Sequence, residues 1–258
     1  MSALQIIDLS SNRLSGSIPS TLANASHLRR IDLGNNSLVG TVPSLGSLSD
    51  LHLLILRNNL LEAKSWEFLI SLANCARLQM LEMSGNKLSG SVPRSVGNIS
   101  TSLQRINLGN NQIVGRIPVE IFNLRNLQML AMGQNMLSGV IPSVIGNLGQ
   151  LVVLILSENK LSGQIPSTIG NLSRLNKLYL DRNYLSGNIP RTLGNYKQLD
   201  MLNLSFNNLE GPIPSELTNS TTLVTLDLSN NFLTGSIPLQ IGALLQLLQL
   251  DISFNRLS

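Results

Sequence analysis

An asparagine recurs through the whole chain at nearly constant spacing, each time in the frame L-x-x-L-x-L-x-x-N-x-L, where L stands for an aliphatic residue. The intervals are 24, 23, 27 and 25 residues and then 24 residues six times. Such regularity indicates a stack of one supersecondary unit in which each copy packs on its neighbours. Function should therefore reside on a surface and not in a catalytic pocket. The eleven asparagines are Asn12, Asn36, Asn59, Asn86, Asn111, Asn135, Asn159, Asn183, Asn207, Asn231 and Asn255.

Each repeat opens with a short strand. In the segment 175–183, Leu178 and Leu180 alternate with Tyr179, so the leucines should point inward and the tyrosine outward. The neighbouring strand is the same segment one repeat away, which predicts parallel pairing about 4.8 Å apart. The asparagine then turns the chain, and its amide can bond backbone groups that a buried turn leaves unpaired. We therefore predict an interior asparagine ladder.

A glycine and a proline follow the asparagine in nine repeats, within L-x-G-x-[IV]-P. The glycine fits a backbone conformation or a close approach that a side chain would obstruct. The proline fixes its own φ and biases the preceding residue toward extended geometry, which predicts an extended or 3-10 segment there. The glycines are Gly16, Gly40, Gly90, Gly115, Gly139, Gly163, Gly187, Gly211 and Gly235, and the prolines are Pro19, Pro43, Pro93, Pro118, Pro142, Pro166, Pro190, Pro214 and Pro238.

These repeats resemble the plant-type leucine-rich repeat of receptor-like kinases, receptor-like proteins and polygalacturonase-inhibiting proteins. The likeness covers residues 4–257. It implies an α/β solenoid, a right-handed leucine-rich repeat superhelix with a concave parallel β-sheet and a mostly extended or 3-10 convex side. We expect residues 1–258 to form this single solenoid, with about ten full repeats and a partial one. The repeats start near 4, 28, 51, 78, 103, 127, 151, 175, 199, 223 and 247.

The third repeat departs from this pattern, because it is longer and has no G-x-I-P. Trp66, Leu69, Ile70 and Ala73 recur at helical spacing, so one helical coil is expected near residues 62–74. A W-x-F-L-x-x-L-x-N-C segment is similar to one in receptor kinases of the grass pattern-recognition immune-receptor subfamily.

Composition excludes several classes of function. Apolar residues make up 43 % of the chain, charged residues 12 % and aromatic residues 3 %. The net charge of +4 is scattered without interleaved aromatics, which argues against nucleic-acid binding. No apolar run is long enough to span a bilayer, and no signal peptide precedes the first repeat. The single cysteine means that the paired-cysteine caps usual in the family are absent. We therefore expect a piece of a longer ectodomain, with any kinase domain outside it.

Residues capable of catalysis or metal binding do not form a recognisable set. Cys75 stands where other repeats place the buried leucine of G-N-L, so a core position is expected. His27 and His52 have no Cys, Asp or Glu at ligand or triad spacing. We expect neither enzyme activity nor a metal or other cofactor.

Sequons for N-glycosylation are a further feature of the repeats. Asn24, Asn98, Asn171 and Asn219 are predicted glycosylation sites, and Asn98 and Asn171 lie in the outer G-N-[IL]-S segment. Asn35 and Asn203 also stand in sequons, but on the inner side, where a glycan would block the concave face. Use of several sequons would place the protein in the secretory pathway.

The concave sheet is the expected ligand surface, because its outward side chains form a continuous array. Apolar side chains gather in its middle, and a contiguous apolar group on a polar sheet indicates partner contact. Tyr179 is the expected anchor, with Asp181 and Arg182 as a polar rim. A second array, Arg29, Arg30, Arg57 and Arg105, suits an acidic peptide or glycan, or is simply a solvated basic face. The predicted ligand-binding residues are Met129, Val153, Ile155, Lys177, Tyr179, Asp181, Arg182 and Met201.

Two functions fit these observations. The first is the ligand-sensing segment of a plant cell-surface receptor in immune or developmental signalling, with a peptide, protein or glycan on the concave face and a co-receptor kinase ectodomain as a further partner. The resemblance then implies the extracellular face of the plasma membrane. The second is a secreted inhibitor of a microbial wall-degrading enzyme. Missing cysteine caps and the helical third repeat favour the receptor.

Overall fold

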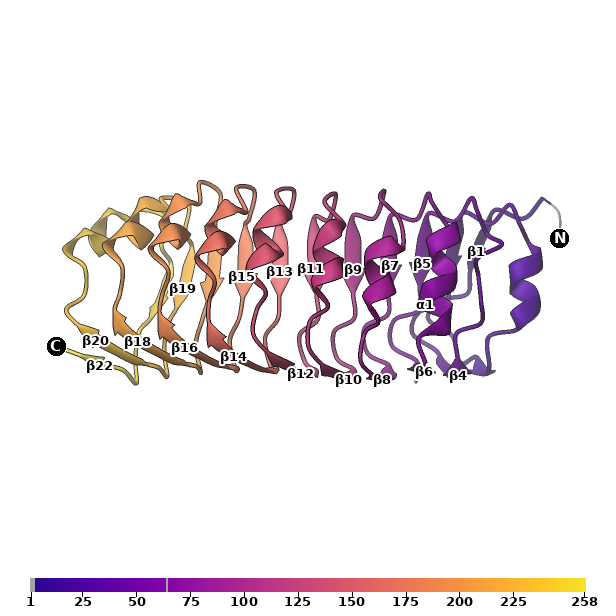
Figure 1. The fold of residues 1–258 in the computed structure, drawn as a ribbon, viewed down its shortest axis with the longest axis horizontal. Coiled ribbons are helices and arrows are strands. Elements are labelled where there is room, and N and C mark those ends of the chain that lie inside the picture. The colour runs from indigo at the N-terminus through magenta and orange to yellow at the C-terminus, as the bar shows by residue number, and fades with distance from the viewer. Residues whose placement is uncertain (1–2, 64) are drawn as a thin grey trace. The chain divides into compact units, whose positions relative to one another are not determined.

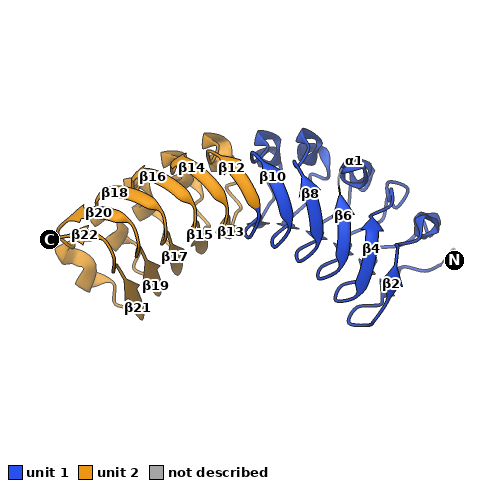
Figure 2. Ribbon diagram, turned by 90° about the horizontal axis from the view of Figure 1, so that it is seen from below, with its two compact units in different colours: residues 1–135 blue, residues 136–258 orange. Residues whose placement is uncertain are grey.

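The computed structural model describes residues 3–63 and 65–258, and the chain forms two compact units, Met1–Asn135 and Met136–Ser258 (Figure 2). Each unit is a stack of coils, and most coils contribute a short strand, a second strand and a helical turn (Figure 1). We call the ladder of strands before the asparagines the front sheet and the ladder after them the back sheet. Both ladders are parallel throughout the pairs described within each unit. The prediction of one continuous solenoid remains a prediction.

The first unit holds six front strands, five back strands and five helical segments among its described residues. The front strands are β1 (Ile6–Asp8), β3 (Arg30–Asp32), β5 (Leu53–Ile55), β7 (Met80–Glu82), β9 (Arg105–Asn107) and β11 (Met129–Ala131). The back strands are β2 (Ser15–Gly16), β4 (Ser37–Thr41), β6 (Leu60–Ala63), β8 (Lys87–Gly90) and β10 (Gln112–Gly115). The helical segments are η1 (Ser20–Asn24), α1 (Glu67–Ser71), η2 (Leu72–Asn74), η3 (Arg94–Asn98) and η4 (Val119–Asn123).

The second unit is more regular. Its front strands are β13 (Val153–Ile155), β15 (Lys177–Tyr179), β17 (Met201–Asn203), β19 (Thr225–Asp227) and β21 (Gln249–Asp251). Its back strands are β12 (Met136–Gly139), β14 (Lys160–Gln164), β16 (Tyr184–Asn188), β18 (Asn208–Pro212), β20 (Phe232–Gly235) and β22 (Arg256–Leu257). Its 3-10 helices are η5 (Ser143–Asn147), η6 (Ser167–Asn171), η7 (Arg191–Asn195), η8 (Ser215–Asn219) and η9 (Leu239–Ala243).

The aliphatic positions of the repeat form the core, as the alternation predicts. In the coil that begins at Leu175, the side chains of Leu178, Leu180 and Leu185 have no exposed surface. Leu193 of η7 closes the coil from the other side and is equally buried. Tyr196 replaces the usual leucine after G-N, and its hydroxyl donates to the Ile169 carbonyl at 2.6 Å. A buried polar tip is therefore satisfied by the neighbouring coil.

The predicted asparagine ladder is confirmed in atomic detail. The Nδ2 of Asn207 donates to the carbonyls of Leu204 and Ser205 in its own turn and to Leu180 in the preceding coil, at 3.1, 3.1 and 3.0 Å. Its Oδ1 accepts the backbone N–H of Leu185 at 3.0 Å. One amide thus forms hydrogen bonds with four backbone groups at a buried turn, two of them in the neighbouring coil. If these groups had no partner, they would destabilise the fold.

The residue before each ladder asparagine adopts a left-handed backbone conformation. In the first unit this residue is serine, asparagine, glycine or glutamine, all with φ between 51° and 64°. In the second unit the position also accepts Arg182, Phe206 and Phe254, with φ of 53°, 53° and 51°. Bulky residues are uncommon in this region, which favours glycine and asparagine. The turn therefore holds bulky residues in a backbone conformation that costs them free energy.

The glycine and proline positions behave as predicted. All nine glycines of the L-x-G-x-[IV]-P motif have positive φ, between 72° and 83°. Each 3-10 helix that follows a motif proline begins directly after it, and the proline carbonyl accepts the first helical N–H, as from Leu193 to Pro190 at 3.1 Å. Neighbouring helices approach closely, because a methyl group added to Gly194 would overlap the Glu216 carbonyl oxygen.

The back sheet is a feature that the sequence reasoning missed. Front strands pair residues 24 apart in the second unit, as in Tyr179 with Asn203, and equivalent positions lie side by side. Back strands pair residues 22 apart, as in Glu210 with Phe232, so non-equivalent positions become neighbours. The asparagine ladder has the same offset of 22 residues, because the Oδ1 of Asn207 accepts the backbone N–H of Leu185.

The third repeat forms a helix, as predicted, but the helix does not begin near residue 62, because Leu60–Ala63 form β6, and only part of the predicted face is buried. Helix α1 covers Glu67–Ser71, and η2 extends it to Asn74. Ile70 and Ala73, expected in the core, are exposed, whereas Phe68 and Leu72 are buried with Leu69. Trp66 precedes the helix in a left-handed conformation and donates its indole N–H to the Ser89 carbonyl at 2.9 Å. Because Trp66 lies in this turn and not in the helix, helical spacing counted from Trp66 predicted Ile70 and Ala73 on the buried face.

We predict that Asn207→Leu lowers the free energy of unfolding by about 1–3 kcal/mol, because buried backbone groups lose their only described side-chain partner. Denaturant unfolding measures the change. The matched control is Asn208→Leu, which changes the exposed neighbouring asparagine. Equal stability of the two variants would contradict the ladder.

Candidate functional site

The front sheet of the second unit aligns most of the predicted ligand-binding residues in two columns. Lys177 pairs with Val153 on one side and Met201 on the other, and Tyr179 pairs with Ile155 in the same register. Neighbouring strands lie about 4.8 Å apart, so these residues lie side by side on the sheet surface. All five are half-buried, not exposed as expected, because each shields its neighbours. The front patch is defined as Val153, Ile155, Lys177, Tyr179 and Met201.

Tyr179 occupies the middle of the front patch. Its hydroxyl donates to the Met201 sulfur in the adjacent strand. Partial burial raises the pKa of the phenol, and the carboxylates of Asp200 and Asp181 raise it further. The tyrosine is therefore neutral, held in place, and bordered by negative charge, as expected of an anchor that contacts apolar and cationic groups of a partner.

Asp181 lies beyond the end of β15 and is half-buried. Desolvation raises the pKa of its carboxyl, and the nearby Glu158 and Asp227 add to this effect. The backbone hydrogen bond within Asp181 and the charge of Arg182 oppose it. The charged form of Asp181 is disfavoured by partial burial and by the neighbouring carboxylates. A cationic group of a ligand would therefore stabilise this carboxylate.

Arg182 and Met129 are placed differently from the rest of the predicted set. Arg182 is exposed, and its guanidinium lies over the ring of Phe206, 4.3 Å from the centroid, so it belongs to the turn and not to the strand. Met129 is half-buried on β11 in the first unit, where it pairs with Arg105. The front patch of the second unit therefore contains neither residue.

Several acids and amides at the ends of the front strands cap their own turns. The carboxylate of Asp227 accepts the N–H and hydroxyl of Ser229 at 3.0 and 2.8 Å. Asn203 makes the same two contacts with Ser205 at 3.0 and 2.7 Å. The acceptor and the serine are two residues apart, a spacing typical of local side-chain to backbone bonds. This spacing in the sequence was the signal for their structural role.

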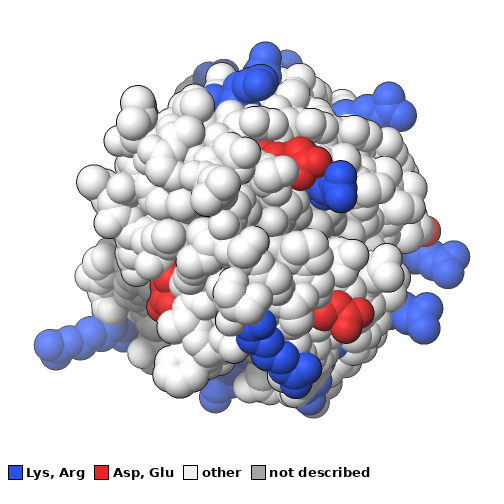
Figure 3. Space-filling view, turned by 90° about the vertical axis from the view of Figure 1, so that its left-hand side faces the viewer, with Lys and Arg blue, Asp and Glu red and all other residues white. Residues whose placement is uncertain are grey.

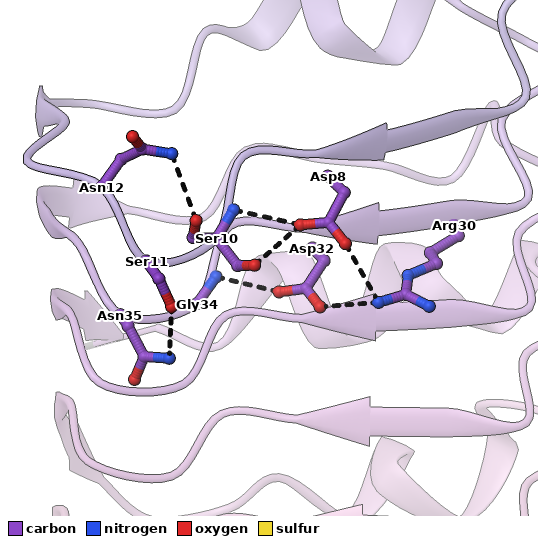
Figure 4. A network of polar contacts seen from close by, with 8 residues as sticks. All are labelled: Asp8, Ser10, Ser11, Asn12, Arg30, Asp32, Gly34 and Asn35. Atoms are coloured by element: carbon purple, nitrogen blue, oxygen red, sulfur yellow. Dashed lines mark hydrogen bonds and ion pairs between the residues drawn. The ribbon is translucent and has the colours of Figure 1, made fainter.

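The predicted basic array of the first unit is partly neutralised. Arg30 bridges Asp8 and Asp32, with Nη2 at 3.2 and 3.0 Å from their Oδ2 atoms (Figure 4). Hydrogen bonds from Ser10 lower the pKa of Asp8, and the charge of Arg30 contributes. The charge of Arg30 is therefore paired within the front sheet, while Arg29, Arg57 and Arg105 are exposed. The array does not form one free basic surface.

Cys75 is buried, as predicted, and desolvation raises the pKa of its thiol to about 11. Both histidines lie close to Asp50. His27 Nδ1 is 3.9 Å from Asp50 Oδ2, and His52 Nδ1 is 2.6 Å from the Asp50 carbonyl oxygen. Spacing along the sequence missed the contact with His27 because stacking joins residues a full coil apart. Within residues 3–63 and 65–258, no group of three potential metal ligands is found.

The four predicted glycosylation sites share one structural position. Asn24, Asn98, Asn171 and Asn219 are the last residues of η1, η3, η6 and η8, and all four are exposed. This is the side of each coil away from the front sheet. Only 12 % of the residues are charged, and on the face shown in Figure 3 most of the surface is uncharged, with acidic and basic side chains scattered over it. Among the described residues, no helix is long and apolar enough to cross a bilayer.

Family comparisons agree with the coil geometry. The sequence matches the leucine-rich repeat region family over residues 60–220, and single leucine-rich repeats match residues 3–25, 27–48 and 222–244. The chain belongs to the leucine-rich repeat family. A comparison with curated proteins finds no match.

Solved structures place these leucine-rich repeats with plant receptor ectodomains. The ectodomain of the membrane receptor kinase GASSHO1/SCHENGEN3 from Arabidopsis thaliana, in complex with Casparian strip integrity factor 2, is 38 % identical over 99 % of this chain and 33 % of that one, with a TM-score of 0.87. The Arabidopsis receptor kinase HAESA, in complex with the peptide hormone IDA and the co-receptor SERK1, is 29 % identical over 99 % and 54 %, with a TM-score of 0.64. The chain thus spans a third to about half of these ectodomains.

Leucine-rich repeats of this kind also occur outside receptors. A plant ice-binding protein is 27 % identical over 90 % of this chain and 74 % of that one, with a TM-score of 0.81. The coil architecture therefore does not by itself determine the ligand. The plant-type repeat predicted from the sequence is confirmed, while the resemblance to the grass immune-receptor subfamily remains a prediction.

We predict that Asp181→Asn raises the melting temperature at neutral pH and leaves it unchanged below the carboxyl range. The folded-state pKa of Asp181 is raised, so the folded protein retains the proton longer and wild-type stability falls as pH rises from about 4. Thermal unfolding between about pH 3 and about pH 7 measures the difference.

Asp251→Asn is the control, because this substitution should change the melting temperature at neutral pH in the opposite direction. Hydrogen bonds from Ser253 lower the pKa of Asp251, so its carboxylate stabilises the fold above the carboxyl range, and this contribution is lost as pH falls. A lower melting temperature of Asp181→Asn at neutral pH would show that the Asp181 carboxylate stabilises the fold, against the prediction.

Proposed function

We propose that this chain is an extracellular ligand-recognition segment of a plant receptor, and that the front patch of the second unit contacts a peptide or protein. The observation that carries this proposal is the cluster of half-buried apolar side chains, Val153, Ile155 and Met201, around Tyr179 on adjacent front strands of the second unit. Removing such surface from water favours association, and aromatic residues are enriched among the residues that dominate binding energy.

The charge around Tyr179 suggests what such a ligand presents. Asp181 and Asp200 border the ring, and Lys177 is the one cation on the described strand β15. A ligand with apolar side chains and at least one cationic group would fill the patch and relieve the repulsion at Asp181. A cationic peptide segment fits this description, whereas an acidic segment would be repelled by Asp181 and Asp200.

The likeness to receptor ectodomains supports the wider assignment. The chain would act within a membrane-anchored receptor kinase, in immune or developmental signalling, with a co-receptor ectodomain as a second partner. In this role it is a binding module and not an enzyme, because recognition uses side chains on a sheet surface and none of them forms a nucleophile and base pair. Catalysis would belong to a kinase domain elsewhere in the parent.

We predict that Tyr179→Asp with Ile155→Asp weakens peptide binding while the fold is retained. The probe is a set of peptides selected from a phage-displayed library on the wild-type segment. Because each charge disrupts the apolar cluster, affinity for these peptides should fall by about tenfold or more, measured by surface plasmon resonance. Circular dichroism checks that the variant folds.

Val140→Asp with Leu239→Asp is the matched control, since it places the same two charges on exposed apolar residues of the second unit outside the front patch. Peptides insensitive to Tyr179→Asp with Ile155→Asp would overturn the front-patch proposal. The inhibitor alternative is tested in parallel with a fungal polygalacturonase. Tight binding and inhibition of that enzyme by the wild-type segment would replace the receptor assignment.

We also propose N-glycosylation at Asn24, Asn98, Asn171 and Asn219, whose common place at the ends of 3-10 helices keeps glycans away from the front patch. After secretion from plant cells, peptide-N-glycosidase F or A should convert these asparagines to aspartate, and mass spectrometry reads the change at each site. Asn203, whose Oδ1 is bonded to Ser205, is the comparison position. Unmodified asparagine at all four sites would contradict both the sites and the secretory route.

A further inference from the structure

Exposed aromatic side chains of the second unit gather on one lateral edge. This edge is formed by the residues immediately before and after each ladder asparagine, and both positions face solvent because the asparagine between them points inward. Tyr184, Phe206 and Phe232 are 58 %, 42 % and 44 % exposed. We define the aromatic edge as Arg182, Tyr184, Phe206, Phe232, Phe254 and Arg256.

The same positions in the first unit carry no aromatic residue within the described ranges. There the residues before the asparagines are Ser11, Asn35, Asn58, Gly85, Asn110 and Gln134. Neighbouring coils join them by hydrogen bonds, as in Asn58 Nδ2 to Asn35 Oδ1 at 2.8 Å. Small polar residues therefore suffice for this turn, and the repeat architecture does not require aromatic rings here.

Aromatic residues also fit this turn poorly. Phe206 has a φ of 53°, a left-handed conformation that asparagine adopts more readily than phenylalanine. Its ring is not part of the core, so burial does not offset either the backbone strain or the exposed apolar surface. A strained residue that leaves an apolar group in solvent indicates a role outside folding.

Two arginines are stacked on these rings. The guanidinium of Arg182 lies 4.3 Å from the Phe206 centroid, and that of Arg256 lies 4.7 Å from the Phe232 centroid. Across residues 3–63 and 65–258, neither guanidinium forms an ion pair. Stacking fixes the plane of each guanidinium and leaves its N–H donors directed past the ring, an arrangement suited to a carboxylate. The edge thus combines apolar surface with two positioned cations.

We propose that the aromatic edge is a second binding surface, separate from the front patch, for a protein segment that carries carboxylates between apolar side chains. The carboxylates pair with Arg182 and Arg256, and the apolar side chains pack on Tyr184, Phe206 and Phe232. A polysaccharide is disfavoured because sugars stack on open aromatic faces, whereas guanidinium groups cover a face of Phe206 and of Phe232.

The charge of this edge is opposite to that preferred at the front patch. The front patch is bordered by Asp181 and Asp200 and favours a cationic ligand, whereas the edge presents Arg182 and Arg256. The two surfaces would therefore accept different partners at the same time. This inference does not depend on the proposed function, and separate variants test the two surfaces.

The probe is a fluorescent octapeptide in which aspartate alternates with leucine, and its partner peptide has asparagine at every aspartate position. The wild-type chain should bind the acidic peptide about tenfold more tightly than the neutral one. Arg182→Gln with Arg256→Gln should remove this preference and the salt dependence of binding, measured by fluorescence anisotropy. The matched control is Arg174→Gln with Arg191→Gln, which removes two exposed arginines of the same unit outside the edge.

Phe206→Asn with Phe254→Asn keeps the test independent of charge. It installs the residue found in equivalent turns of the first unit, so the chain should fold and melt within a few degrees of wild type, while affinity for the acidic peptide falls. Equal binding by the wild-type chain and either edge variant would overturn the proposal. Loss of cello-oligosaccharide binding in place of peptide binding would also overturn it and assign the edge to glycans.

Discussion

The whole fold depends on pairing backbone groups at turns that stack on one another. Each turn between a front and a back strand is covered by the next coil, so water cannot satisfy its carbonyls and N–H groups. One asparagine amide satisfies them in both coils, as Asn183 does with Leu156 O at 3.0 Å and Leu161 N–H at 2.9 Å. Leucine could fill the same volume but could not make these bonds, which explains why a polar residue recurs inside an aliphatic core.

That constraint leaves a few positions free to vary, and the surfaces differ because their neighbours differ. Front-strand positions stack on their equivalents, so a single change alters a column, and apolar residues in consecutive coils combine into a patch. The residues beside the ladder asparagine face outward and stack less tightly, which allows Arg182 to lie over Phe206. One repeat thus supplies both a sheet surface and an edge surface, with separate chemistry on each.

The sequence predicted the fold well because equivalent residues of successive repeats pack on one another, so the spacing of the repeat shows which residues are in contact. Leu178, Asn183 and Gly187 each have a physical cause that acts within one coil or with the adjacent one, and the structure places them as expected.

Contacts between non-equivalent positions of the repeat were not predicted from the sequence. His27 meets Asp50, and Tyr179 is influenced by Asp200, although neither pair stands at a motif spacing. The face of α1 was misassigned because Trp66 leaves the helical path. At the candidate site, the columns were predicted, but mutual shielding and the stacking of Arg182 on Phe206 required coordinates.

The offset of the back sheet has a consequence for how such chains can diverge. Because Glu210 lies opposite Phe232 and Ser186 opposite Asn208, each back position contacts a different repeat position in the next coil. Duplicating or deleting an entire 24-residue coil would preserve like-with-like pairing along the front strands. On the other ladder the same event would keep the offset of two positions, because this offset also recurs from coil to coil. A whole coil can therefore be gained or lost without a shift of register in either ladder.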